Sequence, residues 1–493
     1  MTPRLVNLRK LASPHWLLLV VLAAGALLRV AVAVAYRPGL FYQDSWDYID
    51  LAYGSPIVGV SVQHPFGYPL LLHGLALVQR SVITITTTQH LAGLIGGVVL
   101  YAILVRLRVS RTLSALAVAV VLLDIYVVTL EQYILSEAFF SLTLLGSAYF
   151  AIRGERRTAE LAASGLLLAV ATSLRTAALF AVPAWLGYLL WTRRGLRGVV
   201  AAALALTLPL LAYATYSARG GGSFSVKPPF DGIFLYGRVA ELADCHHVDV
   251  PAVTRPLCGQ AARFPHKTPS VWIFDGPVVG LLSRGNYPAA NKALRTFARA
   301  TILERPVAYA SLVLGDSLGY FTPGVTTRDD PDVLLLPAGP TPVLNVVARD
   351  KWEPGFRPAV HAPSSFLRGY QRWLHTPRWL LAVFVLAGLL SLASSMMKRW
   401  RSRLTRRPEV FLLLGAGLSI LIGSTATTTS TLRYLIPVVP LLTAGGVLAL
   451  VDLSGRAPQL PGRRPQPSTG ASEGPACATR SGSTRRGRHR SRR

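Results

Sequence analysis

The sequence is poor in charge, and in acidic charge above all. Only 15% of its 493 residues are charged, and its 23 Asp and Glu are outnumbered by 51 Lys and Arg. Hydrophobic residues make up 51% of the chain and form long runs with almost no charge. Because about 20 apolar residues cross a bilayer, such runs exclude a water-soluble body and predict an all-α polytopic membrane protein. The few acidic side chains are the first candidates for chemistry.

Several motifs of well-known enzyme classes are also missing. The chain has no Walker-type phosphate loop, no HExxH, no GxSxG with supporting context and no Cys/His spacing typical of metal sites. No internal repeat of fixed period is visible either. The absence of repeats counts against a secondary transporter, whose halves are often related by repeat symmetry.

Cysteine is scarce, with three residues in the chain. Cys245 and Cys258 fall in a long polar segment, and Cys477 lies near the C-terminus. If the polar segment is external, an oxidising compartment favours a Cys245–Cys258 disulfide, and two free thiols are the alternative. The sequence Cys245-His246-His247 has no partner cluster, so we interpret it as a loop rather than a zinc site.

The positive charge is concentrated at the ends of apolar runs. The net charge is +28, and short basic clusters occur at residues 4–10, 106–111, 153–157, 193–197 and 398–407. This distribution is typical of cytoplasmic loops and argues against nucleic acid as a partner. A further cluster at 480–493 lies in a Gly, Ser, Pro and Arg-rich tail that cannot bury a core and should be disordered. We expect this tail to contact anionic membrane lipids.

The basic clusters fix the parity of the membrane crossings. They predict ten transmembrane helices in the plasma membrane, with both termini cytoplasmic and the acidic first loop on the outer face. Residues 67–80 are apolar but short, and we interpret them as an interfacial helix. The predicted parts are an N-terminal membrane module (1–216) with a first outer loop (36–89), an external loop or mixed domain (217–377), C-terminal membrane helices (378–452) and a disordered basic cytoplasmic tail (453–493).

Two carboxylates lie in the first outer loop. Asp44 and Asp47 are three residues apart, so one face of a helical turn can carry both. On the outer surface such a pair can deprotonate an acceptor hydroxyl as general base, or hold a divalent cation. A solvated helix cap after the first span is the alternative.

Two arginines lie at the outer ends of predicted spans, against the positive-inside trend. Arg175 and Arg433 can each hold a phosphate group with two hydrogen bonds, a contact that is stronger in a partly dry site than in water. Snorkelling to the interface is the alternative. Glu137 begins an apolar span and can orient an arginine or support the acid pair. Arg29, inside the first span, can pair with a carboxylate such as Glu137 or border the site.

The order of these features resembles the GT-C class of integral-membrane glycosyltransferases. The features in question are the first span, Asp44 with Tyr48 and Ala52, and the segments 64–71 (HPFGYPLL), 135–137 (LSE), 173–175 (SLR) and 433–437 (RYLIP). The branch that this order resembles is that of the protein O-mannosyltransferases and aminoarabinose transferases, in an actinobacterial-like form. The resemblance extends over residues 10–216 and 378–452.

The resemblance implies that a sugar is transferred from a polyprenyl-phosphate carrier to an acceptor on the outer face. It assigns the role of catalytic base to Asp44. The acidic residue that commonly follows in the family is Ser45 here, so Asp47 is the second candidate. We expect no strictly required cofactor, and a divalent cation, Mg or Mn, at Asp44 and Asp47 is the alternative.

The remaining roles combine the positions of these residues in the chain with the resemblance. We assign binding of the donor phosphate to Arg175, Arg433 and Tyr434, and supporting roles to His64, Glu137 and Arg29. The family typically has two consecutive prolines where this chain has Pro65 and Phe66. Residues 217–377 correspond to the variable external region that tends to set the acceptor, which can be a protein, a lipid or a glycan.

Other functions remain open. A transporter or flippase for a lipid-linked glycan is the first alternative. Arg29 and the break at Arg175 give it limited support, since transporters place charges and broken helices near the midplane, whereas the outward clustering of the acids counts against it. A polymerase or ligase of surface polysaccharide would use a pyrophosphate-linked oligosaccharide instead. A structural envelope protein would leave the outer carboxylates replaceable.

Overall fold

The computed structural model describes residues 13–53, 61, 63–154, 157–219, 224–245, 250–259, 268–274, 278–282, 285–323, 335–394 and 406–455. All of them belong to one compact unit of the chain, residues 1–457. The predicted tail beyond residue 455, the basic residues 4–10 and most of the cluster 398–407 lie outside the described residues, as do His246, His247 and Cys477.

Within this part of the chain, five helical segments are long and apolar enough to cross a membrane. They are α2 (Trp16–Ala35), α5 (Val82–Arg106), α11 (Leu196–Arg219), α21 (Arg407–Thr427) and a segment formed by α22 (Leu432–Leu435), η6 (Ile436–Val438) and α23 (Val439–Leu453). Two bent pairs, α6 (Arg111–Leu122) with α7 (Ile125–Gln132) and α19 (Ser364–Trp373) with α20 (Arg378–Ala393), bring the number to seven if each is one span. The all-α polytopic membrane class is confirmed, and the predicted number of ten spans is not.

Three predicted spans correspond to shorter helices. These are α8 (Glu137–Arg153), α9 (Thr158–Leu174) and the pair η2 (Thr176–Ala181) with α10 (Val182–Trp191). Helices α8 and α9 have 17 residues each. Because a helix rises about 1.5 Å per residue, each is short of the about 30 Å of a hydrocarbon core.

The run from residue 113 to 128, which hydropathy predicts as one span, is broken by a carboxylate. The side chain of Asp124 accepts hydrogen bonds from the backbone of Tyr126 (2.8 Å) and Val127 (3.4 Å), and so caps the start of α7. The axes of α6 and α7 differ by 51° at this point. Aspartate favours such a cap over a helix interior because its short side chain satisfies free N–H groups.

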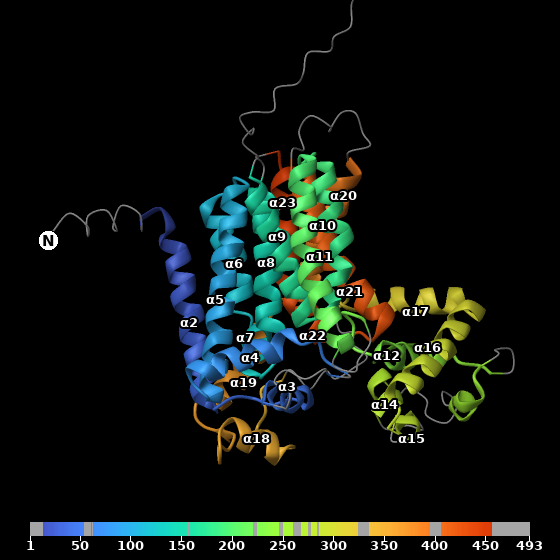
Figure 1. Cartoon of the computed structure of the whole chain (residues 1–493). Coiled ribbons are helices and arrows are strands. Elements are labelled where there is room, and N and C mark those ends of the chain that lie inside the picture. Colours follow the sequence, from blue (N-terminus) through green and yellow to red (C-terminus); the bar gives the residue numbers. More distant parts are fainter. Residues whose placement is uncertain are drawn as a thin grey trace, which may run out of the picture. The chain divides into compact units, whose positions relative to one another are not determined.

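Helices far apart in the sequence run side by side (Figure 1). Helix α8 packs on α5 and α9, α9 packs on α11, and α23 packs on α20 and α21. Small residues permit the closest approach, since a Cβ at Gly165 would lie 2.0 Å from the carbonyl oxygen of Ala202. Glycine at position 165 is therefore needed for α9 and α11 to pack at this distance.

The segment 217–377 contributes to two hydrophobic cores. Phe230, Trp272 and Phe297 belong to a small core of their own, whereas Trp352 belongs to the large core of the membrane helices. The elements of this segment are α12 (Asp231–Val239), η3 (Ala240–Leu242), η4 (Ala252–Leu257), α14 (Pro269–Phe274), α15 (Val278–Leu282), α16 (Tyr287–Glu304), α17 (Pro306–Gly319), α18 (Val346–Trp352), β2 (Ala359–Val360) and α19. The predicted domain boundaries stay a prediction.

The first loop is held in place by residues 346–360. Its elements are β1 (Tyr36–Arg37), α3 (Gln43–Tyr53) and α4 (Gly67–Val78), and η1 (Ser13–His15) precedes α2. Strand β1 pairs with β2 in antiparallel register, and α18 packs against α3. The ring of Phe356 stacks on Phe41 and Trp46, with centroid distances of 5.3 and 6.4 Å. These contacts fix the position of α3, which carries both predicted acids.

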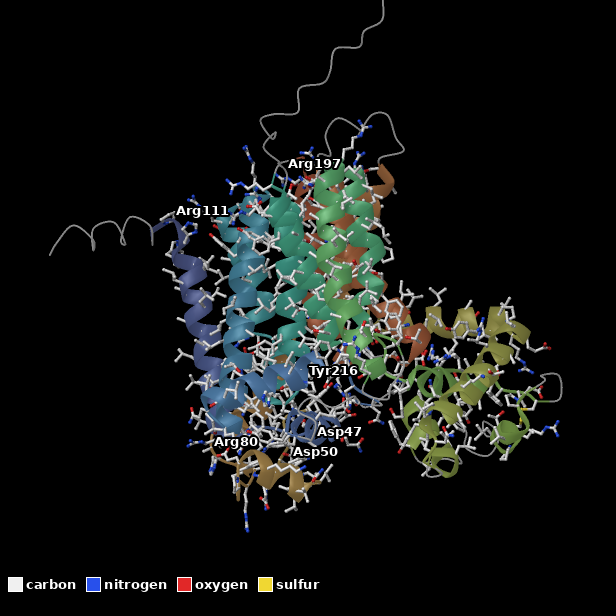
Figure 2. All side chains as sticks on the ribbon, in the orientation of Figure 1. Asp47, Asp50, Arg80, Arg111, Arg197 and Tyr216 are labelled. Carbon is white, nitrogen blue, oxygen red and sulfur yellow. A yellow bond between two sulfur atoms is a disulfide. The ribbon has the colours of Figure 1, made fainter. Side chains whose placement is uncertain are left out.

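The acidic first loop and two of the predicted cytoplasmic arginines lie at opposite ends of the helices. Figure 2 shows Asp47, Asp50 and Arg80 at one end and Arg111 and Arg197 at the other. Asp47 and Asp50 of the first loop therefore lie at the opposite end of the helices from Arg111 and Arg197. Which end faces the cytoplasm stays a prediction.

Candidate active site

Helix α3 presents Asp44 in its first turn. The helix starts where Ser45 Oγ accepts a hydrogen bond from the backbone N–H of Tyr42 (2.9 Å). Trp46 stacks on Phe41 at 4.6 Å, which anchors the turn in the hydrophobic core. Asp44 is left about a quarter exposed, at 26%.

Arg433 connects this turn to the last membrane segment. Thr431 caps the short helix α22 by accepting a hydrogen bond from the backbone of Arg433 (3.3 Å). The guanidinium then lies 2.9 Å from Asp44 Oδ2, measured from Nη2. It also lies over the ring of Tyr42, 4.6 Å from the centroid. A planar cation between a carboxylate and an aromatic face suits arginine better than lysine.

Glu137 joins the two arginines that the sequence singles out. It is the first residue of α8, where the helix dipole favours a negative charge, and its side chain is 1% exposed. Glu137 Oε1 accepts hydrogen bonds from Arg175 Nη1 and from Arg433 Nε, the latter at 2.9 Å. Arg175 lies in the extended link between α9 and η2, with its guanidinium 5.1 Å from the ring centroid of Tyr434.

Five predicted residues therefore meet in one cluster: Asp44, Glu137, Arg175, Arg433 and Tyr434. Two carboxylates and two guanidinium groups give this cluster a formal charge of zero. Burial raises the pKa of Asp44, but the charges of Arg433 and His64 outweigh it and hold that pKa below its usual range. Burial and the nearby charges of Asp44 and Glu137 raise the pKa of Tyr48, so its hydroxyl stays protonated.

His64 and Asp47 form a second pair beside this cluster. His64 Nε2 lies 3.3 Å from Asp47 Oδ2, and the ring of His64 packs against Tyr48 at 4.6 Å. Asp47 is 52% exposed, whereas the side chain of His64 is 13% exposed. The two acids thus differ in environment, because Asp44 contacts an arginine and Asp47 contacts a histidine.

A cavity of about 240 Å³ opens onto the cluster. Its lining includes Asp44, His64, Arg175, Arg433 and Tyr434, but not Asp47. Further lining comes from the first loop, from the stretch between α9 and η2, from α12 and α14, and from the end of α21 with the link that follows it. Of the two acids, Asp44 is the one with access to a molecule in this cavity.

Arg29 has a different partner from the one considered in the sequence. Its Nη2 lies 2.6 Å from Glu131 Oε1, so it does not form the pair with Glu137 that was one of the alternatives. Glu131 Oε2 lies 2.9 Å from His90 Nδ1, and His90 Nε2 lies 2.8 Å from Gln132 Oε1. All four side chains are buried. This network ties α2, α5 and α7 together inside the helical bundle.

Some residues of the site escape the sequence argument. Tyr42 under Arg433 gives no signal in one sequence, since aromatic residues are frequent at membrane interfaces. Residues 424–431 do give one, because seven of these eight residues are Ser or Thr and the run ends two positions before Arg433. Five of them border the cavity.

Two further predictions concern cysteines and metal ions. Cys245 and Cys258 are joined by a disulfide, with their Cα atoms 5.6 Å apart, and they pack against the small core. The described residues bring together no group of three or more His, Cys, Asp or Glu that could hold a metal ion. Dependence on Mg or Mn stays a prediction.

One family model matches part of the chain. Residues 63–217 match the model of the family described as dolichyl-phosphate-mannose-protein mannosyltransferase, a range that includes His64, Glu137 and Arg175. No curated protein matches the chain.

Solved structures show weaker likenesses. One is an oligosaccharyltransferase from Archaeoglobus fulgidus tethered to an acceptor peptide, with 13% identity and a TM-score of 0.44, covering 90% of this chain and 50% of its own. Another is ArnT from Cupriavidus metallidurans bound to undecaprenyl phosphate, with 14% identity and a TM-score of 0.34, covering 87% and 77%. The chain spans about half the length of the first, and likenesses at this level carry no argument. The family match confirms the predicted resemblance: over residues 63–217, this membrane protein resembles the dolichyl-phosphate-mannose-protein mannosyltransferases.

Proposed function

We propose that this protein is a membrane glycosyltransferase that moves a sugar from a polyprenyl-phosphate carrier to an acceptor hydroxyl on the outer face of the membrane. The observation that carries the proposal is the meeting of Asp44, Arg175 and Arg433 at one cavity, with Glu137 between the arginines. The description of the matched family names a sugar on a lipid phosphate, dolichyl-phosphate-mannose, which supports a polyprenyl-phosphate sugar as the donor.

Asp44 is the proposed general base. It takes the proton of the acceptor hydroxyl while the acceptor oxygen bonds to C1 of the sugar and the bond from C1 to the phosphate oxygen breaks. Attack from the face opposite the phosphate inverts the configuration at C1. Asp47 is less suited to this role because it does not border the cavity.

Arg433 and Arg175 are proposed to stabilise the leaving polyprenyl phosphate. The charges balance during transfer, because Asp44 loses its negative charge on protonation while the phosphate gains one. The cluster then carries one net positive charge beside the new negative charge. Preorganised charge of this kind is worth most in a site that excludes water.

Arg433 also explains how Asp44 becomes a competent base. The charge of Arg433 holds the pKa of Asp44 low, which makes the carboxylate a weak proton acceptor. A donor phosphate competes for the same guanidinium, so its binding weakens the ion pair and returns the pKa of Asp44 toward its usual range. Base strength is thereby coupled to donor binding.

The test is release of sugar by purified protein in liposomes from radiolabelled polyprenyl-phosphate mannose and polyprenyl-phosphate arabinose. The proposal expects carrier-dependent release of at least one sugar to an added acceptor or to water. A well-folded protein that moves labelled lipid between leaflets without breaking its sugar bond would contradict the proposal and favour a flippase.

A further inference from the structure

The hydroxyl-rich run before Arg433 lies at the cavity and has no role in the chemistry above. It begins in the last turn of α21 and continues through the link to α22. The members that border the cavity are Ser424, Thr427, Thr428, Thr429 and Thr431, which we call the hydroxyl wall. We propose that the hydroxyl wall binds the hydroxyl groups of the sugar carried by the donor. This inference rests on the proposed function and deepens it.

Two members of the wall are free to bind a ligand. Ser424 is 2% exposed and Thr429 is 7% exposed. Their hydroxyl oxygens are buried and make no hydrogen bond to any described residue. Most buried hydroxyls in folded proteins are hydrogen-bonded, so these two require a partner. Both border the cavity, which makes a bound molecule the natural source of that partner.

Two other members of the wall, Thr427 and Thr431, use their hydroxyls within the chain. Thr427 Oγ1 donates to the carbonyl oxygen of Gly423 (2.8 Å), and Thr431 Oγ1 accepts from the backbone of Arg433. Thr427 and Thr431 therefore shape the turn, whereas the hydroxyls of Ser424 and Thr429 have no partner among the described residues.

The backbone of the wall is held rigidly by two tyrosines. Tyr309 donates a hydrogen bond to the carbonyl oxygen of Ala426 (2.6 Å), and Tyr320 accepts one from the backbone of Thr431 (3.0 Å). A Cβ at Gly423 would lie 2.3 Å from the ring of Phe180, so that ring packs directly on the backbone where the wall begins. A preorganised wall of this kind favours selective binding, because little ordering remains to be done.

The chemistry of the wall fits a sugar better than a phosphate. A hydroxyl group both donates and accepts hydrogen bonds, and so do the hydroxyls of a sugar, whereas a phosphate diester only accepts. The phosphate is matched by the guanidinium groups of Arg433 and Arg175. Since Thr431 lies two positions before Arg433 and both border the cavity, a sugar attached to that phosphate is within reach of the wall.

The experiment compares Thr429→Val and Ser424→Ala with the wild type. The probes are polyprenyl-phosphate mannose, polyprenyl-phosphate arabinose and sugar-free polyprenyl phosphate. We expect kcat/KM for the sugar donor to fall between about fivefold and a hundredfold in each variant. The Kd for sugar-free polyprenyl phosphate should stay unchanged. Thr443→Val is the matched control, because the Thr443 hydroxyl is also buried without a partner among the described residues but does not border this cavity.

A second arm protects the test against misfolded variants. Donors that lack one sugar hydroxyl are compared in wild type and in Thr429→Val, and the variant should no longer distinguish the donor that lacks the partner of Thr429. Wild-type turnover in both variants would overturn the inference alone. Equal weakening of sugar-free polyprenyl phosphate would overturn it too, since the wall would then bind the lipid phosphate. If the wild type neither binds nor consumes any of the three lipids, the proposed function itself fails.

Discussion

Replacing Glu137 by Gln tests whether the two arginines work as a unit. Glu137 Oε1 accepts from both Arg175 and Arg433, and the carboxylate is 1% exposed. Gln keeps the size of the side chain and one acceptor oxygen but removes the charge between two cations. Removing one partner of a buried ion pair costs about 3–5 kcal/mol, and we take the lower end because the acceptor remains. About 3 kcal/mol of lost orientation in the transition state lowers turnover by roughly a hundredfold.

Binding and turnover should respond in opposite ways to this change. The variant cluster carries one more positive charge, so its affinity for polyprenyl phosphate should not fall, whereas sugar release should. The assays are release of radiolabelled sugar and binding of polyprenyl phosphate to the same preparation, with thermal unfolding in detergent as the measure of stability. Glu160→Gln is the control, because Glu160 pairs with the partly exposed Arg153 and Arg157 and should change stability by at most about 1 kcal/mol. Wild-type turnover in Glu137→Gln would refute the reasoning.

Three further predictions follow from the same contacts. The lowered pKa of Asp44 means that its charged form stabilises the folded protein at pH values above the unfolded pKa, and that this stabilisation is lost as pH falls through the folded pKa. The acid limb of kcat/KM reports the free enzyme, whereas the acid limb of kcat reports the enzyme with donor bound, in which the donor phosphate competes for Arg433. The acid limb of kcat/KM should therefore lie at lower pH than that of kcat. Coincident limbs in the two pH profiles would contradict this. Phe356→Ala should cost about 3–5 kcal/mol and speed hydrogen exchange in α3, because Phe356 stacks on Trp46; unchanged exchange would show that α3 is held by other contacts. Glu131→Gln should lower the free energy of unfolding by about 3 kcal/mol, seen as a lower unfolding temperature in detergent, because it leaves Arg29 buried without its carboxylate. The affinity for polyprenyl phosphate should stay as in the wild type.

Charge and hydropathy in the sequence predict the membrane class and the charged residues of the candidate site. Asp44 stands out as one of the few acids of the first outer loop. Glu137, Arg175 and Arg433 stand out because each is an ionisable residue at the end of a predicted span, where burial is costly unless the residue is paired. The structure pairs all four. The partners themselves could not be assigned, because the sequence leaves open which helices are neighbours.

The number of spans and the position of Arg29 depend on details that hydropathy averages out. Asp124 looks like one polar residue in an apolar run, yet its cap on α7 bends the chain. Glu131 and Glu137 are both possible partners of Arg29 by spacing, and only the packing of α2 against α7 selects Glu131. The hydroxyl wall is visible in the sequence as a Ser/Thr run, but its burial and its two unpartnered hydroxyls are tertiary facts.

The most direct test of the account is the transfer rate of Asp44→Asn beside that of Asp47→Asn. Both are measured as release of radiolabelled sugar from the polyprenyl-phosphate donor that the wild type uses, with binding of polyprenyl phosphate as the check on folding. The account predicts that Asp44→Asn still binds the lipid phosphate and loses transfer by about a hundredfold or more, as expected for loss of a general base, while Asp47→Asn keeps most of its activity. Full transfer by Asp44→Asn would contradict the assignment of Asp44 as the base.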